Sequence, residues 1–187
     1  AGAQVVGMGE LFTAPYFALE QRKVWLPMAE DAVSGPTVLA LREVAARLGV
    51  VLVAPIYELD ASTGERFNTA VVIDHDGRWC GRYRKTHIPC GTNEQGEFHE
   101  TFYYGASDGA PQPDGAVVLG SNPYFPVFPT AVGRQQLRHV AFLHLAPAPP
   151  TSRVRREEPR HRHGPAVCAE AVQETSHIEG IKKERGD

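Results

Sequence analysis

Apolar runs separated by turn residues fill the first 134 residues and predict strands in a regular order. Residues 3–10, AQVVGMGE, form a short apolar run that ends in the acid Glu10, and residues 50–58, VVLVAPIYE, form a longer β-branched run. Both patterns are typical of buried strands. Residues 66–86, RFNTAVVIDHDGRWCGRYRKT, contain two more apolar runs around an Asp-Gly pair, which predicts an antiparallel hairpin.

One helix is predicted between the first two strands. In residues 34–49, SGPTVLALREVAARLG, apolar side chains recur at helical spacing, namely Val38, Leu41, Val44, Ala45 and Leu48. Ser34 is the predicted N-cap, Pro36 falls in the first turn, where a missing N–H is tolerated, and Gly49 ends the helix. The order strand, helix, strand, strand, strand indicates an α/β fold with a buried sheet.

A long segment, residues 87–126, follows the last of these strands and has no periodic pattern. Aromatic residues are frequent in it: Phe98, Phe102, Tyr103 and Tyr104. We therefore interpret it as an ordered loop that forms a site rather than as a disordered linker. Residues 124–134, YFPVFPTAVGR, then predict a final hairpin-like element.

The sequence changes character after Arg134. Residues 1–133 hold nine Lys and Arg against 15 Asp and Glu, a net charge of −6, whereas residues 134–187 hold ten against seven, a net charge of +3. The later segment has one aromatic residue, and its Pro- and Arg-rich part at 147–164 lacks the apolar content of a core. We predict a partial domain over residues 1–134 and an unrelated, disordered tail over residues 135–187.

Composition narrows the setting of the protein. The net charge of −3 gives the whole chain no strong attraction to nucleic acid. No apolar run reaches the length of a membrane span, and no secretory signal pattern opens the sequence. Three cysteines, Cys80, Cys90 and Cys168, occur without a CxxC spacing. They favour a reducing compartment, and hence a cytoplasmic protein, over a disulfide framework or a zinc knuckle.

A few side chains are candidates for chemistry. Glu10, at the end of a buried strand, can serve as a base or can be a solvated acid at a strand edge. Lys85, where a strand enters the long segment, can stabilise an oxyanion or can be an edge charge. Glu100 lies among aromatics and can orient Lys85 or be exposed. Cys90 has no evident base beside it, which makes a nucleophile role the minor alternative. The histidines of RHRH at 160–163 lie among arginines, which favours a solvated basic tail over a metal site.

Three stretches together resemble the nitrilase superfamily, the carbon–nitrogen hydrolases. They are GAQVVGMGELFTAPYF, then VVLVAPIYELDASTGERFNTAVVIDHDGRWCGRYRKTHIP, and then NEQGEFHETFYYGASDG with YFPVFPTAVGR. Their order and spacing match across residues 1–134, and the second stretch is similar to the β-ureidopropionase-like and N-carbamoylputrescine amidase-like branch. The resemblance implies a partial nitrilase-type α-β-β-α sandwich, which in the family assembles into homo-oligomers.

The resemblance also implies roles for three residues. Glu10 in GELF corresponds to the general base that deprotonates a cysteine thiol, Lys85 in YRKTHIP to the cation that stabilises the oxyanion, and Glu100 in HETFYY to a structural glutamate beside the lysine. In such enzymes the thiolate attacks an amide or ureido carbon, ammonia leaves, and water hydrolyses the thioester. The implied partner is a small amide or N-carbamoyl substrate, and neither a metal nor an organic cofactor is needed.

The sequence departs from this pattern after FPTAVGR. Where the family has a strand and an elbow with the nucleophilic cysteine, this sequence reads QQLRHVAFLHLAPAPP, and Cys168 lacks the expected spacing. The resulting hypothesis is a frameshift just after Arg134 in a truncated hydrolase that also lacks the first strand and helix of the family. Three functions are therefore expected as alternatives: a carbon–nitrogen hydrolase, a catalytically inactive fragment of one, or a binding module that uses the basic residues 153–163 on a polyanion.

Overall fold

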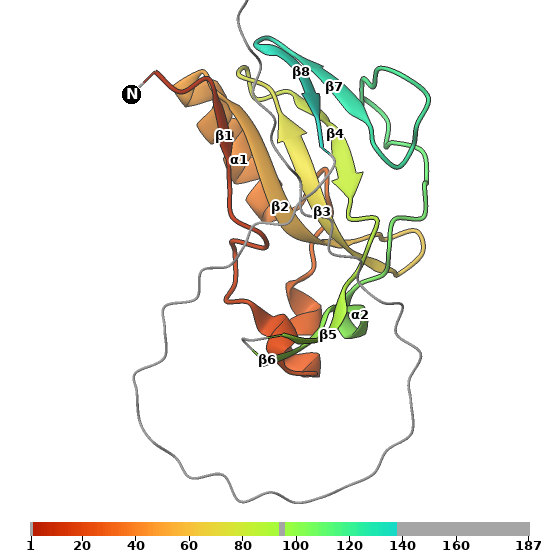
Figure 1. Cartoon of the computed structure of the whole chain (residues 1–187). Coiled ribbons are helices and arrows are strands. Elements are labelled where there is room, and N and C mark those ends of the chain that lie inside the picture. Colours follow the sequence, from red (N-terminus) through yellow and green to blue (C-terminus); the bar gives the residue numbers. More distant parts are fainter. Residues whose placement is uncertain (1, 94–95, 138–187) are drawn as a thin grey trace, which may run out of the picture. The chain divides into compact units, whose positions relative to one another are not determined.

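A four-stranded sheet is the centre of the fold (Figure 1). The computed structural model describes residues 2–93 and 96–137. The strands are β1 (Val5–Gly7), β2 (Val51–Leu59), β3 (Arg66–Ile73) and β4 (Trp79–Arg84), and they lie in this order in the sheet. β1 and β2 are parallel, while β2–β3 and β3–β4 are antiparallel. The predicted α/β class is confirmed, as is the order strand, helix, strand, strand, strand.

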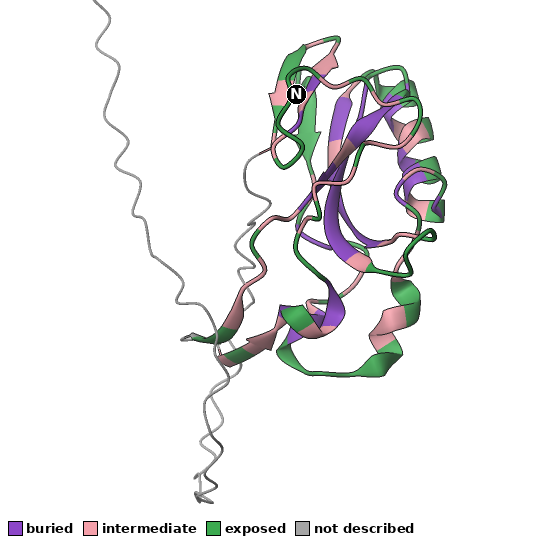
Figure 2. Cartoon of the chain, turned by 90° about the vertical axis from the view of Figure 1, so that its right-hand side faces the viewer, coloured by how far each residue is buried: buried purple, intermediate pink, exposed green. Residues whose placement is uncertain are grey.

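Helix α1 (Pro36–Leu48) connects β1 to β2 and covers one face of the sheet. Figure 2 shows α1 buried on the side toward the sheet and exposed on its outer side. The core between them is formed by Val38, Leu41 and Ala45 of the helix and by Leu52, Ala54, Ile56, Val71 and Ile73 of the sheet. Leu48 shares the predicted apolar face but is 61% exposed, because it lies in the last turn.

The two ends of α1 differ in how well they were predicted. Gly49 ends the helix in the left-handed conformation (φ 63°), as expected. The predicted cap by Ser34 is wrong, because the N-cap residue is Gly35 and the Ser34 hydroxyl donates to Asp31. The carboxylate of Glu30 takes the capping role, since its Oε2 accepts the backbone N–H of Thr37 at 2.9 Å.

The segment after β4 is more regular than expected. Instead of one irregular loop it contains the hairpin of β5 (Cys90–Asn93) and β6 (Gly96–His99) and the short helix α2 (Glu100–Tyr103). These elements gather at one end of the sheet with the 3-10 helices η1 (Phe17–Leu19) and η2 (Lys23–Met28) (Figure 1). The C-terminal ends of β1, β2 and β4 point toward this group.

A second hairpin packs beside β4. It is formed by β7 (Val127–Thr130) and β8 (Gly133–Gln136), as the pattern around residues 124–134 predicted. Phe128 of β7 is fully buried in an apolar cluster with Val51, Val72 and Cys80. None of the helices within the described ranges is long and apolar enough to cross a membrane.

Several predictions fall on residues 138–187, which lie outside the described residues. They concern the disordered tail, the RHRH stretch, Cys168 and the basic residues 153–163. The boundary at Arg134 and the frameshift just after it stay predictions as well, and β8 continues for two residues past Arg134.

Candidate active site

Three charged side chains meet at the end of the sheet where β1 and β4 finish. Glu10 follows β1, Lys85 comes directly after β4, and Glu100 opens α2. Nζ of Lys85 lies 3.0 Å from Oε1 of Glu10 and 2.7 Å from Oε2 of Glu100. The structure therefore brings together the three residues that the sequence singled out, with the lysine between the two acids.

The strand ladder explains why Lys85 faces this cluster. Its backbone N–H donates to the carbonyl of Asn68 at 2.8 Å, which extends the pairing of β3 with β4 by one residue. Residues directly opposite in an antiparallel pair point to the same face. The side chains of Asn68 and Lys85 therefore lie side by side, and both reach Glu10.

The two carboxylates are bonded differently. Both donors to Glu10 converge on Oε1, namely Nζ of Lys85 and Nδ2 of Asn68, the latter at 2.5 Å. Glu100 uses both oxygens: Oε1 accepts the hydroxyl of Tyr16 at 2.8 Å and Oε2 accepts Lys85. Within the described ranges no donor reaches Oε2 of Glu10, so this oxygen is the one available to accept a proton.

The three charged side chains of this cluster are largely buried. Glu10 and Glu100 are 6% and 4% exposed, and the Lys85 side chain is 12% exposed. Burial disfavours the ammonium form of Lys85, but the charges of Glu100 and Glu10 outweigh it and raise the pKa of Lys85 above its usual range. Lys85 is therefore a fixed cation, suited to stabilise negative charge that develops on a nearby atom.

An aromatic cluster that contains four tyrosines lies next to the acids, and one of these tyrosines, Tyr16, is hydrogen-bonded to Glu100. Tyr16, Tyr57, Tyr103 and Tyr104 belong to one cluster with Leu11 and Phe17. Burial, followed by the charge of Glu100, raises the pKa of Tyr16, so its hydroxyl stays a donor. Among the described residues the buried hydroxyl of Tyr104 has no hydrogen-bond partner, and burial, followed by the charge of Glu100, raises its pKa, so it stays a donor.

Sequence reasoning missed Asn68 and Tyr16. Asn68 and Thr69 are two fully buried polar residues before the apolar run Ala70–Ile73 of β3, and that break in the pattern was the available signal. Tyr16 gave no signal, because its contact with Glu100 joins residues 84 positions apart.

The opposite face of β3 and β4 carries a separate ion network. Glu58 is fully buried and accepts Nε and Nη2 of Arg84 at 3.0 and 2.7 Å. Arg82 and the hydroxyl of Thr69 also donate to Glu58, and Arg84 pairs with Asp60 at 2.6 Å. Thr69 directly follows Asn68, and Arg84 directly precedes Lys85. Because successive residues of a strand point to opposite faces, the Glu58 network and the Glu10 cluster lie on opposite faces of the sheet. This network ties β2 to β4 on the face of the sheet opposite Lys85.

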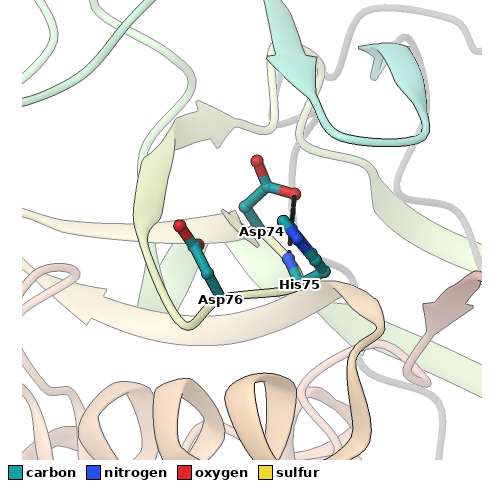
Figure 3. Close-up of side chains that lie close together, drawn as sticks. All are labelled: Asp74, His75 and Asp76. Carbon is teal, nitrogen blue, oxygen red and sulfur yellow. Dashed lines mark hydrogen bonds and ion pairs between the residues drawn. The ribbon is translucent and has the colours of Figure 1, made fainter.

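A candidate cation cluster lies in the turn between β3 and β4, at the opposite end of these two strands from Lys85. Asp74, His75 and Asp76 offer ligand atoms within 4.8 Å of one another (Figure 3). The carboxylate of Asp74 is already taken up, because it accepts Nη2 of Arg78 at 2.7 Å and the backbone N–H groups of His75 and Ala131 at 2.8 and 3.1 Å. Asp74 thus anchors the β7–β8 hairpin to the turn. Because its carboxylate oxygens already accept these hydrogen bonds, the cluster does not fit a metal centre.

Cys80 and Cys90 differ in their bonding state. Cys80, the free cysteine of the described residues, is buried in the apolar cluster of Phe128, and burial raises the pKa of its thiol. Cys90 opens β5 opposite His99 in the β5–β6 ladder and is disulfide-bonded, so the expectation that the cysteines stay reduced is wrong for this residue. Cys80 is shut in an apolar cluster and Cys90 is engaged in a disulfide, so neither is a thiolate beside Glu10 in this structure.

Comparison with known proteins places the chain in a family. The family model of the carbon–nitrogen hydrolases matches residues 1–171, and the chain therefore belongs to this family. The match extends beyond Arg134. The resemblance that the three sequence stretches indicated is confirmed.

The similar curated proteins include a β-ureidopropionase and N-carbamoylputrescine amidases. A β-ureidopropionase of Arabidopsis thaliana is 36% identical over 109 residues, which cover 58% of this chain and 26% of that protein. An N-carbamoylputrescine amidase of the same plant is 36% identical over 107 residues, which cover 57% of this chain and 34% of that protein. A carbon–nitrogen hydrolase structure from Helicobacter pylori G27 is 28% identical with a TM-score of 0.48 and covers 56% of this chain and 33% of its own. The chain spans about a quarter to a third of the length of these relatives.

Proposed function

We propose that the chain is a hydrolase of carbon–nitrogen bonds in small amides or N-carbamoyl amines, with Glu10, Lys85 and Glu100 as its polar catalytic set. The observation that carries the proposal is the ammonium group of Lys85, held between two buried carboxylates at 3.0 and 2.7 Å. The similarity to a plant β-ureidopropionase and a plant N-carbamoylputrescine amidase supports the substrate class.

The hydrogen bonds suggest different roles for the two acids. Both oxygens of Glu100 are occupied, which suits a residue that holds Lys85 in place. Oε2 of Glu10 is the oxygen left to accept a proton, which suits a general base. Lys85 then stabilises the negative oxygen of the tetrahedral intermediate.

The proposed reaction needs a thiol as nucleophile. The thiol gives its proton to Glu10, and the sulfur forms a bond to the amide or ureido carbon. The carbon–nitrogen bond breaks, ammonia leaves with the proton from Glu10, and water then hydrolyses the thioester and restores the thiol. Cys80 is unsuited to this role because it is buried in an apolar cluster. Cys90 is disulfide-bonded and can act as the nucleophile only after reduction, and Cys168 is the other cysteine to test.

The test is ammonia release by the full chain from N-carbamoyl-β-alanine and from N-carbamoylputrescine. We expect release with at least one substrate and its loss in Lys85→Met, but not in Lys23→Met, which replaces an exposed lysine. With a reductant present to convert the Cys90 disulfide to thiols, Cys90→Ala and Cys168→Ala identify the nucleophile, because only the variant without it loses activity. Equal release by wild type and Lys85→Met contradicts the proposal.

A second candidate is a chain that retains the acid–lysine cluster without turnover. The position of Cys80, away from Glu10 and Lys85, favours it. Under this alternative, residues 1–134 are a partial hydrolase domain and the tail arises from a frameshift. Sequencing the coding DNA from Thr130 to Asp187 and translating all three frames tests it. A cysteine-containing strand and elbow in another frame supports the second candidate, and its absence from every frame counts against it.

A further inference from the structure

Asn68 is a polar residue at a fully buried position of the central sheet. It is fully buried in β3, and the four residues Ala70–Ile73 that follow Thr69 are apolar and buried. Its amide nitrogen donates to Glu10, but its Oδ1 is buried and has no hydrogen-bond partner within residues 2–93 and 96–137. A buried polar atom without a partner is unfavourable. An apolar residue would fill this position without leaving a buried polar atom unpaired. The feature that distinguishes Asn68 from such a residue is its hydrogen bond to Glu10.

The orientation of the Asn68 amide follows from charge. Glu10 is an acceptor when ionised, so only the Nδ2 end of the amide can face it. The bond is 2.5 Å long and joins the same oxygen, Oε1, that accepts Lys85 at 3.0 Å. Two donors from adjacent positions of the β3–β4 ladder thus hold one oxygen of Glu10.

We propose that Asn68 is a positioning residue: it fixes Oε1 of Glu10 beside Lys85 and so keeps Oε2 as the oxygen that accepts the proton. The inference rests on the role of Glu10 in the proposed function. A carboxylate that turned freely would exchange its two oxygens and present either one to the reacting thiol. With two donors on Oε1, the electron pairs of that oxygen are engaged, and the proton that leaves the thiol is taken by Oε2.

The chain offers matched controls for this role. Thr69 is the next residue of β3, is also fully buried and also donates to a buried carboxylate, Glu58, but on the opposite face of the sheet. Thr69→Val therefore removes a comparable bond without touching the site. Tyr16→Phe removes a bond to Glu100 and leaves both donors of Glu10 in place.

Infrared difference spectroscopy of the full chain tests the inference without requiring turnover. The carboxylate bands of Glu10 are isolated by subtracting the spectrum of Glu10→Gln in each background. The separation between the antisymmetric and symmetric stretching bands grows as hydrogen bonding to the two oxygens becomes more unequal. We expect this separation to narrow in Asn68→Leu and to stay unchanged in Thr69→Val and Tyr16→Phe.

An unchanged band separation in Asn68→Leu overturns the inference. Circular dichroism establishes that each variant is folded. If Asn68→Leu does not fold, Asn68→Ser repeats the test with a side chain too short to bridge to Glu10. A narrowing of the same size in Thr69→Val also overturns the inference, because the effect would then reflect a general loosening of β3.

Kinetics separate this inference from the proposed function. If the chain releases ammonia, Asn68→Leu lowers kcat by about 10- to 100-fold with little change in KM, because the base is misplaced while substrate binding persists. Ammonia release with no effect of Asn68→Leu on kcat overturns the positioning role and leaves the proposed function standing. A narrowed band separation without ammonia release supports the positioning of Glu10 and counts against the proposed function.

Discussion

Lys85 and Glu100 form an ion pair with 2.7 Å between Nζ and Oε2, although 15 residues separate them in the chain. The β5–β6 hairpin accounts for the distance along the chain, because it carries the chain out and back between β4 and α2. The pair therefore joins the end of the sheet to the first residue of α2.

Removal of Lys85 is expected to destabilise the fold. In Lys85→Met two buried carboxylates lose their shared cation, and loss of one partner from a buried ion pair costs about 3 kcal/mol or more. Urea denaturation measures the change in the free energy of unfolding. Lys23→Met is the control and should change it by less than about 0.5 kcal/mol, because Lys23 is exposed. Equal effects of the two substitutions would show that the Lys85 cluster contributes nothing to stability.

Stability is expected to fall in alkaline solution. The pKa of Lys85 is raised, and burial raises the pKa of Tyr57 to about 12. Both groups titrate near pH 10 in the unfolded chain, so above about pH 10 the folded chain holds more protons than the unfolded chain. The free energy of unfolding then decreases as pH rises through the folded values, and below about pH 10 this contribution is fully present. Denaturation at a series of pH values measures the slope, and Tyr57→Phe should reduce it. An unchanged slope in that variant would exclude Tyr57 as a source.

Asp74 is expected to act through the hairpin that it anchors and not through a metal. Asp74→Ala removes the acceptor of Arg78 and Ala131 and should lower stability by about 2 kcal/mol. Asp76→Ala, at an exposed neighbour, should have a smaller effect. Thermal denaturation with and without excess Ca²⁺, Mg²⁺ or Zn²⁺ should give the same Tm. A rise in Tm that disappears in Asp74→Ala would instead establish a cation site.

Gly81 is expected to tolerate no side chain. Its φ is 152°, and a Cβ there would meet the ring of Phe128, with Cδ1 at 2.9 Å. Gly81→Ala should lower stability by about 2 kcal/mol, because the fully buried ring cannot move without losing its own contacts. Gly9→Ala is the control, since no atom lies within 4 Å of the Cβ position. In the double variant with Phe128→Leu the two losses should not add, because the smaller side chain leaves room for the methyl group. Full additivity would exclude the clash as the cause.

The sequence predicted the sheet well because its signals are local. The apolar runs of β1, β2 and β3, the helical spacing of α1 and the Asp-Gly turn each lie within one element. The wrong cap at Ser34 arose from competition among neighbouring acceptors, since Asp31 binds its hydroxyl. The β5–β6 hairpin was missed because its four-residue strands are too short to show a period.

The candidate site could be predicted only in part. Glu10, Lys85 and Glu100 were found through their surrounding motifs, and the structure brings them together. Asn68 and Tyr16 were not found, because their partners are 58 and 84 positions away. The ion network of Glu58 was missed for the same reason. An acid at the end of a predicted strand is normally taken as exposed to solvent, and only the structure shows that Arg82 and Arg84 lie beside it.

The layout of the sheet also sets an order of folding. β2, β3 and β4 are consecutive and joined by short turns, so their contacts close small loops and form at low entropic cost. The contact of Glu10 with Lys85 spans 75 positions, and that of Tyr16 with Glu100 spans 84. On a ribosome, the strands can pair before Glu100 has left the exit tunnel. Glu10 then stays hydrated in the nascent chain, and the acid–lysine cluster loses its water only in the last stage of folding.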